Sequence, residues 1–208
     1  MVTPVPARTV PKAQRREQLI RATMKCVSRN GLSATTMAEV TKEAGLSLGI
    51  VNLHFQSKEK LLVETLRYVA DEYQAEWHKA AGIEGSPTER LASLIELDFS
   101  AKVCQREKLA VWVAFWGEAK SRPTYRRICA ALDKEYVLVI QTLCDEICKT
   151  GKHPQVDTEI VATGYGALTD GLWLDLLLTP RDMSRAKAKR IAFDYFSSHF
   201  PRRFTALS

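Results

Sequence analysis

Residues 35–62, TTMAEVTKEAGLSLGIVNLHFQSKEKLL, constrain the fold of this chain more than any other segment. Thr36 offers a cap oxygen to a first short helix, and Gly45 can end that helix because glycine adopts the left-handed conformation at little cost. Ser47 then caps a second short helix, whose inward positions include Val51. Two helices joined by a short glycine turn form a helix-turn-helix, which places its second helix in the DNA major groove. The segment therefore predicts a DNA-binding module.

The distribution of charge supports the same interpretation. Residues 1–65 hold ten Lys and Arg against five Glu, a net charge of +5, while the whole chain carries +6. Positive charge is therefore concentrated at the end that carries the motif, as a phosphate-binding surface requires. A generic basic surface would explain the charge alone, but its coincidence with the motif favours DNA binding.

The bulk properties of the chain exclude several other classes of protein. Its 208 residues, 46% of them hydrophobic, suffice for a folded core. No apolar run reaches the ~18–20 residues that cross a membrane, and residues 1–11 contain prolines but no hydrophobic signal segment. Five cysteines argue against a disulfide framework, and no nearby His completes a zinc site with Cys144 and Cys148. We therefore expect a cytoplasmic protein with no membrane segment, no metal and no cofactor.

Helical periodicity runs through almost the whole chain. Apolar residues recur three and four positions apart and strand patterns are nearly absent, so we expect an all-α fold with about nine helices. The first helix is expected to end at Asn30-Gly31, before the motif. Glycine and proline breaks separate the later helices. These expected helices are 58–81, 87–102, 106–120, 122–150, 157–178 and 183–200.

Three segments carry a resemblance to a known family. Residues 44–62, AGLSLGIVNLHFQSKEKLL, resemble TetR-family one-component transcriptional regulators, whose pattern is Ala-Gly-hydrophobic-Ser, a Gly two residues on, an aromatic-Phe pair, Ser-Lys-Glu and Leu-Leu. Residues 110–123, AVWVAFWGEAKSRP, and 164–178, GYGALTDGLWLDLLL, resemble the BetI-type subgroup of choline-responsive repressors of glycine betaine synthesis.

The resemblance implies a domain organisation and a mode of action. We expect a flexible arm over residues 1–11, a helix-turn-helix DNA-binding domain over 12–57, and a larger helical ligand-binding and dimerisation domain over 58–208. The family acts as a dimer on palindromic double-stranded operator DNA. The subgroup implies a repressor that a small cationic effector, such as choline or another quaternary ammonium, releases from DNA.

The DNA contacts are expected to divide between phosphate and base recognition. In the resembling family, Thr36, Ser47 and Lys58 lie at the phosphate backbone. The candidates for base recognition on the second motif helix are Leu48, Gly49, Ile50, Asn52 and Leu53. Asn52 has the geometry for a bidentate contact with adenine, and the apolar side chains can contact thymine methyl groups.

One position of the second motif helix leaves two interpretations open. The family usually carries aromatic residues, often tyrosine, where this chain has Asn52 and His54. His54 either donates a hydrogen bond to phosphate or packs beside Phe55.

The effector is expected at an aromatic cluster. The candidate ligand-binding rings, which recur at helical spacing, are Phe99, Trp112, Phe115, Trp116, Tyr165 and Trp173. Ring faces beside a carboxylate suit a quaternary ammonium. Glu118 is the first choice for that carboxylate, with Asp98 and Asp170 as alternatives, while Tyr125 and Tyr136 are interpreted as ordinary core or surface residues. A simple core or dimer-seam role for the rings remains the competing interpretation.

The last two helices are expected to form the dimer surface, as a four-helix bundle with those of a second copy. Their apolar residues are Ile160, Leu168, Leu172, Leu176, Leu177, Ile191, Phe193, Tyr195 and Phe196.

Several alternatives remain beside a choline-responsive repressor. We find no Gly-x-Ser-x-Gly elbow, His-Glu-x-x-His or phosphate-binding glycine loop, so we predict that the protein is not an enzyme. One alternative is a TetR-type regulator that senses a drug-like cation or a fatty-acyl compound. Another is a helical interaction protein that has no ligand. Whether the effector releases or promotes DNA binding stays open.

Overall fold

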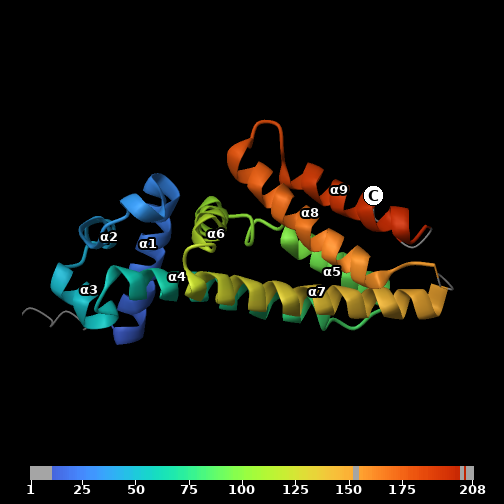
Figure 1. The fold of residues 1–208 in the computed structure, drawn as a ribbon, viewed down its shortest axis with the longest axis horizontal. Helices are drawn as coiled ribbons and strands as arrows, with labels where there is room; N and C mark the ends of the chain where they lie inside the picture. Colours follow the sequence, from blue (N-terminus) through green and yellow to red (C-terminus); the bar gives the residue numbers. More distant parts are fainter. Residues whose placement is uncertain (1–10, 152–154, 202–203, 205–208) are drawn as a thin grey trace, which may run out of the picture. The chain divides into compact units, whose positions relative to one another are not determined.

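A computed structural model describes residues 11–151, 155–201 and 204, and all its regular elements within these ranges are helices, nine in number. The expected all-α fold is confirmed (Figure 1). The described chain divides into two compact units between Thr65 and Leu66, inside helix α4 (Lys58–Ala81). The arm expected over residues 1–11 lies, apart from Pro11, outside the described residues.

The first unit contains the helix-turn-helix. It consists of α1 (Lys12–Ala34), α2 (Met37–Ala44), α3 (Leu48–Phe55) and the beginning of α4. The first helix does not end at Asn30-Gly31: Gly31 takes a φ of 77°, and the chain continues helically beyond this kink to Ala34. The turn between α2 and α3 forms as predicted, because Gly45 adopts a left-handed φ of 64°.

Side-chain capping explains where α2 begins. The Thr36 hydroxyl accepts a hydrogen bond from the Glu39 backbone N–H, and the Glu39 carboxylate accepts one from the Thr36 backbone N–H. This reciprocal pair satisfies two helix-end donors. Ser47 occupies the corresponding position before α3, but its side chain makes no capping hydrogen bond.

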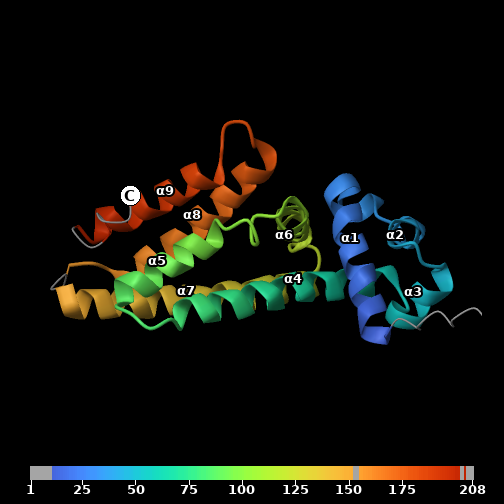
Figure 2. The same cartoon turned by 180° about the vertical axis from the view of Figure 1, so that it is seen from behind.

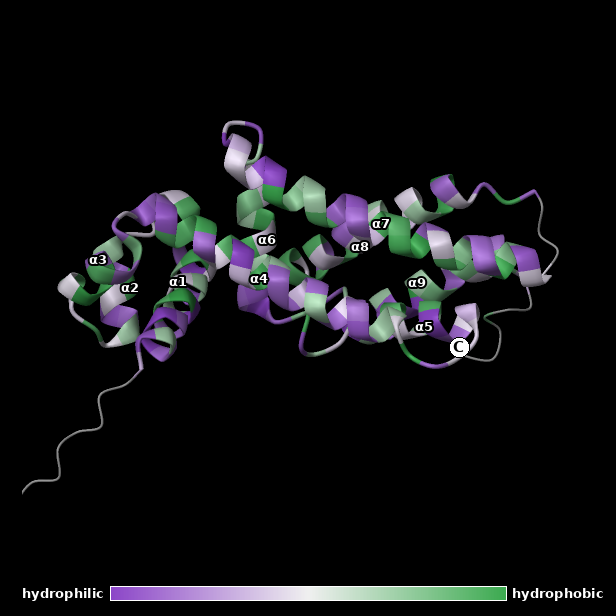
Figure 3. Cartoon of the chain, turned by 90° about the horizontal axis from the view of Figure 1, so that it is seen from below, coloured by the Kyte–Doolittle hydropathy of each residue, from purple (hydrophilic) through white to green (hydrophobic). Residues whose placement is uncertain are grey.

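The second unit is a helical bundle. Its helices are the rest of α4, α5 (Pro87–Asp98), α6 (Arg106–Glu118), α7 (Pro123–Gly151), α8 (Thr158–Leu178) and α9 (Arg185–His199). Helix α5 ends earlier than the expected residue 102, because Phe99 to Cys104 form turns in which the Ser100 hydroxyl accepts from the Val103 N–H. Figures 1 and 2 show α8 beside α7 and α9 beside α8. Along α7, hydrophobic and hydrophilic residues are interspersed (Figure 3), and the buried ones recur three or four positions apart from Tyr125 to Ile147.

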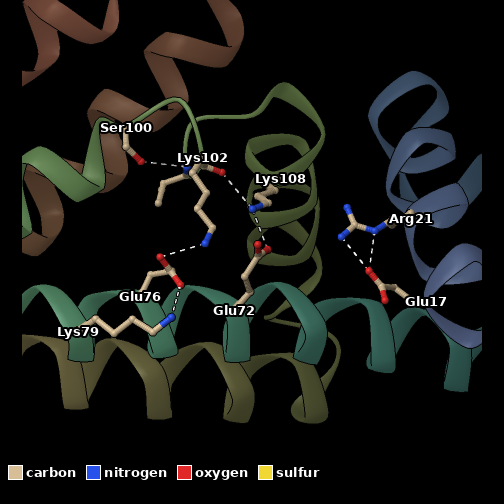
Figure 4. Close-up of polar contacts among 9 residues, drawn as sticks. Glu17, Arg21, Glu72, Glu76, Lys79, Ser100, Lys102 and Lys108 are labelled. Carbon is tan, nitrogen blue, oxygen red and sulfur yellow. Dashed lines mark hydrogen bonds and ion pairs between the residues drawn. The ribbon is translucent and has the colours of Figure 1, made fainter. Parts of the chain in front are cut away.

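Two ion pairs join α4 to the segment that leads into α6. Lys108 Nζ lies 2.7 Å from a Glu72 carboxylate oxygen, and Lys102 Nζ lies 3.0 Å from one of Glu76 (Figure 4). Lys108 is buried, and its ammonium also donates to the Lys102 carbonyl. A partly buried pair with an additional hydrogen bond holds its geometry better than an exposed one. These contacts fix the start of α6 against α4.

Three further observations bear on cofactors and location. No helix in the described ranges combines the length and the apolar character that a membrane crossing needs. Within the same ranges, no group of three or more His, Cys, Asp or Glu is arranged to hold a metal ion. The five cysteines are free thiols.

A close contact between α8 and α9 depends on a glycine. Tyr195 Oη donates a hydrogen bond to the Val161 carbonyl at 3.0 Å. A Cβ on Gly164 would collide with Tyr195 Oη. Substitution of a helical glycine by alanine normally stabilises, by up to about 1 kcal/mol. At position 164, however, an alanine would force the Tyr195 side chain to move and to lose its hydrogen bond to Val161.

We therefore expect Gly164→Ala to lower the free energy of unfolding by about 1 kcal/mol or more in urea titrations. The control is Gly117→Ala in α6, where a Cβ would meet nothing within 4 Å. This variant should be as stable as the wild type or more so. Equal stability of the two variants would contradict the assigned role of Gly164.

Candidate functional site

The exposed face of α3 is apolar and carries one amide. Leu53 is 72% exposed and Leu48 is 49% exposed, while Val51 and Phe55 on the opposite face are buried. Asn52 is also exposed, between the two leucines. Two open leucines on one short helix form a small apolar patch that a binding partner can cover. The expected division of α3 into an inward and an outward face is therefore present.

Two further positions of α3 differ in their access to a partner. A Cβ on Gly49 would meet nothing closer than Ser47 Oγ at 3.9 Å, so the backbone there is open to close approach. Ile50 is half-buried.

His54 and Lys58 make contacts within the first unit. The His54 ring lies beside Phe55, with ring centroids 6.2 Å apart. Partial burial, and then the positive charges of Lys12, Arg15 and Arg16, lower the pKa of His54. The Lys58 ammonium donates to the Ser33 carbonyl at 2.9 Å, which holds it at the start of α4. His54 and Lys58 are therefore held at the end of α3 and the start of α4.

The second unit contains a cavity of about 240 Å³. Residues of α4, α6, α7 and α8 line it: Tyr73, Trp112, Trp116, Leu132, Asp133, Tyr136, Val137, Thr163, Gly166, Ala167, Thr169, Asp170 and Trp173. The two α6 indoles stack with centroids 6.1 Å apart, and Tyr73 meets Trp173 edge to face at 5.2 Å. Aromatic surfaces from four helices thus converge on one space.

A buried carboxylate beside this cavity holds three tyrosines, and two of them, Tyr73 and Tyr136, line the cavity. Asp98, the last residue of α5, accepts hydrogen bonds from Tyr73 at 2.7 Å, Tyr136 at 2.6 Å and Tyr165 at 2.7 Å. Its backbone carbonyl accepts a fourth from Trp173 Nε1 at 2.9 Å. Burial raises the pKa of Asp98, the tyrosine hydrogen bonds lower it, and the net result is a pKa of about 6.

Two more carboxylates lie among the lining residues. Partial removal from water raises the pKa of Asp133 to about 6. The same cause, followed by the charges of Asp133 and Asp98, raises the pKa of Asp170 to about 7. Both residues retain contact with solvent. Perturbed carboxyl groups around an aromatic cavity are typical of a binding site.

The structure brings together only part of the ligand site expected from sequence. Trp112, Trp116 and Trp173 line the cavity, as does the alternative carboxylate Asp170. The remaining expected rings, Phe99, Phe115 and Tyr165, are buried outside the lining.

The carboxylate preferred from sequence is placed elsewhere. Glu118 stands at the end of α6, paired with Arg122, and is not among the residues that line the cavity.

Among the aromatic and acidic residues of the lining, sequence reasoning missed Tyr73, Asp133 and Tyr136. Asp133 and Tyr136 stand at i and i+3 on α7, a spacing that places them on one helical face, and this signal was available. Tyr136 was interpreted as an ordinary residue, but it both lines the cavity and bonds to Asp98. Nothing in the local pattern of α4 distinguishes Tyr73 from neighbouring core positions.

Comparisons with known proteins connect both units to one family. The family of bacterial regulatory proteins named tetR matches residues 19–65, and the family described as BetI-type transcriptional repressor, C-terminal, matches residues 87–201. The regulator BetI of Burkholderia mallei is 33% identical over 182 residues, which cover 87% of this chain and 91% of that protein. This chain belongs to the BetI-type TetR family.

Other similar proteins agree with this assignment. BetI of Paraburkholderia xenovorans is 32% identical over 182 residues, with 87% of this chain and 91% of that protein covered. Among solved structures, a transcriptional regulator of Pseudomonas aeruginosa PAO1 has a TM-score of 0.80 at 26% identity, covering 96% of this chain and 97% of that one. A regulator from Saccharomonospora viridis, solved in complex with choline, has a TM-score of 0.79 at 24% identity, with coverages of 90% and 97%.

The resemblance expected from sequence is thereby confirmed. The BetI-type TetR proteins are DNA-binding transcriptional regulators, and their family is not enzymatic. The helix-turn-helix of the first unit is the part that this family uses for DNA.

For this BetI-type regulator, Asn52→Ala and Lys58→Gln should affect DNA binding differently. Loss of a base contact weakens specific binding by about 1–3 kcal/mol and leaves non-specific binding unchanged. Loss of a phosphate contact weakens binding to any sequence and reduces the slope of log affinity against log salt by about 1. Fluorescence anisotropy measures the two affinities of each variant: specific affinity with the DNA upstream of the regulator's own gene, and non-specific affinity with a shuffled duplex.

Lys149→Gln, at the exposed end of α7, is the control for a simple loss of charge. It should leave both affinities close to the wild-type values. If Asn52→Ala weakened specific and non-specific binding equally, Asn52 would not read a base.

Proposed function

We propose that this regulator is a homodimeric repressor that leaves a palindromic operator when a small quaternary ammonium cation, such as choline, occupies the cavity of the second unit. The observation that carries the proposal is the composition of the cavity wall. Five aromatic rings and two carboxylates line it, and none of the described lining residues is Lys, Arg or His. Ring faces and carboxylates attract a cation whose methyl groups exclude water.

The size of the cavity selects among the possible effectors. Pockets for drug-sized ligands measure about 300–1,000 Å³. The 240 Å³ available here falls below that range and suits a small cation better than a drug-like cation or a long acyl chain. Its acidic lining also disfavours the carboxylate of a fatty acid.

One polar group in the cavity favours an effector with a hydrogen-bonding group. Thr169 is buried and lines the cavity, and its hydroxyl makes no hydrogen bond of normal geometry. Burial, and then the charge of Asp98, raise the pKa of the neighbouring Tyr165, and its proximity to Thr169 offsets only a small part of that rise. An unsatisfied buried hydroxyl is costly, so a ligand hydroxyl that pairs with it gains affinity. Choline carries such a hydroxyl, and the Saccharomonospora viridis relative was solved with choline.

An apolar stripe on α8 supports the proposed dimer. Ile160 and Leu178 are 67% and 65% exposed, and they lie about five helical turns apart on the same face as the exposed Leu174. A second copy would cover this stripe in an isologous contact. Of the residues expected at the dimer surface, Leu172, Phe193 and Phe196 are instead buried in the chain's own core.

The proposed DNA-binding residues are those predicted from sequence, with the exposed face of α3 in the major groove. Helix α4 offers a route for coupling, because it begins at Lys58 and carries Tyr73 of the cavity wall. A ligand that prefers one position of α4 shifts the population of DNA-competent dimers. Conversion of a 99% bound population to 99% free needs a preference of about 5.5 kcal/mol.

We expect millimolar choline chloride to release the protein from the DNA upstream of its own gene in fluorescence anisotropy. Trp116→Ala should abolish this response, because it removes a half-buried ring from the cavity lining and leaves the DNA-binding unit unchanged. Sodium chloride at equal concentration is the essential control, since DNA affinity falls with salt. If choline left the DNA affinity unchanged, choline would not be the effector. If choline increased the DNA affinity, the protein would be a co-repressor-dependent regulator and not one that choline releases.

Choline binding should also weaken as pH falls from 8 to 5.5. The pKa values of Asp170, Asp98 and Asp133 are about 7, 6 and 6. Below these values the carboxyl groups become neutral, and the attraction for a permanent cation is lost. Three of the four tryptophans line the cavity, so quenching of their fluorescence reports the affinity. An affinity that is constant over this range would show that the carboxylates do not act on the ligand.

A further inference from the structure

We propose that Asp98 is the positioning residue that makes the cavity selective for cations over neutral molecules of the same shape. This inference rests on the proposed function and assigns selectivity to a residue that does not itself line the cavity. The buried carboxylate acts through Tyr73 and Tyr136, which bind it by their hydroxyls and present their rings to the cavity.

The hydrogen bonds of Asp98 determine where the rings lie. One carboxylate oxygen accepts from Tyr73, and the other accepts from both Tyr136 and Tyr165. The backbone carbonyl accepts from the indole of Trp173. Three of these four donors line the cavity, and they come from α4, α7 and α8. A single residue thus orients a wall built by three helices.

The charge of Asp98 lacks a cationic partner in the described part of the chain. Its side-chain donors are neutral hydroxyls, and no described ion pair includes it. Complete burial of an anion without a counter-ion is unfavourable, which is the reason for its raised pKa. A cation in the adjoining cavity relieves this cost, whereas a neutral molecule does not.

Burial also distinguishes Asp98 from the carboxylates of the lining. Asp133 and Asp170 retain contact with solvent, which screens their charge. Asp98 is completely excluded from solvent, so its field acts through a medium of lower effective dielectric constant. The hydrogen bonds that Tyr73 and Tyr136 donate to an anion also increase the electron density of the rings that face the ligand.

The experiment compares two probes of nearly the same shape in wild type and Asp98→Asn. The probes are choline and neohexyl alcohol, its uncharged analogue in which carbon replaces nitrogen. At pH 8, titration calorimetry should show that the variant loses choline affinity by about tenfold. Its affinity for neohexyl alcohol should change less than about twofold, because the amide retains the shape of the carboxylate. An equal loss for both probes would reduce Asp98 to a packing role and overturn the proposal.

The matched control is Asp170→Asn, which removes a carboxylate that lines the cavity directly. It should lower choline affinity by less than Asp98→Asn does. If Asp170→Asn lost more choline affinity than Asp98→Asn, the lining carboxylate would be the source of the selectivity, and the inference would be overturned. Wild-type protein that binds neither probe would refute the proposed function itself. Equal wild-type affinity for both probes would refute only the role of Asp98.

A second variant keeps the proposal testable if Asp98→Asn does not fold. The Tyr136 hydrogen bond lowers the pKa of Asp98, so Tyr136→Phe should raise it while the ring is retained. The pH at which choline affinity is half lost should then move upward, and binding of neohexyl alcohol should stay independent of pH. This measurement uses a background of Asp133→Asn and Asp170→Asn, so that neither lining carboxylate contributes. An unchanged midpoint would overturn the proposal.

The other groups around Asp98 do not titrate in that range. Those that face it are Tyr73, Tyr165 and Cys104, all with raised pKa values, and they stay neutral. Arg185 of α9, which acts on the Cys104 thiol, stays charged.

Discussion

Four helices of the larger unit meet at the buried end of α5, where the Asp98 carboxylate accepts hydrogen bonds from three tyrosines of α4, α7 and α8. A carboxylate in this position is unfavourable unless each of its oxygens is paired. The requirement determines where Tyr73, Tyr136 and Tyr165 lie, and Trp173 is tied to the same residue through its indole. Of these four residues, Tyr73, Tyr136 and Trp173 line the cavity.

The two units depend on different physical effects. In the DNA-binding unit, short-range capping and turn conformations dominate: the reciprocal bonds of Thr36 and Glu39 begin α2, and the left-handed Gly45 ends it. The second unit depends on long-range contacts, such as Tyr165 with Asp98, which are 67 residues apart in the chain. Helix α4 contributes residues to both units.

The candidate ligand site was only partly predictable. Helical spacing places Trp112 and Trp116 on one face, and both line the cavity. The same spacing argument included Phe115, which instead packs edge to face on Tyr125 with centroids 4.6 Å apart. Glu118 was favoured for its proximity in sequence to these rings, yet it pairs with Arg122. Periodicity identifies the side of a helix that is buried, but it does not say whether that side meets a core or a cavity.

The sequence by itself determined the helical class, the helix-turn-helix and the exposed face of α3, because caps, glycine turns and apolar periodicity act within a few residues of one another. Tertiary structure alone decided where each candidate carboxylate lies relative to the aromatic cavity. From the sequence, Asp98 was only an alternative to Glu118, together with Asp170, and no local pattern ranked it above them. Its role arises because folding brings hydroxyls from three distant helices within 2.6–2.7 Å of it and removes it from water.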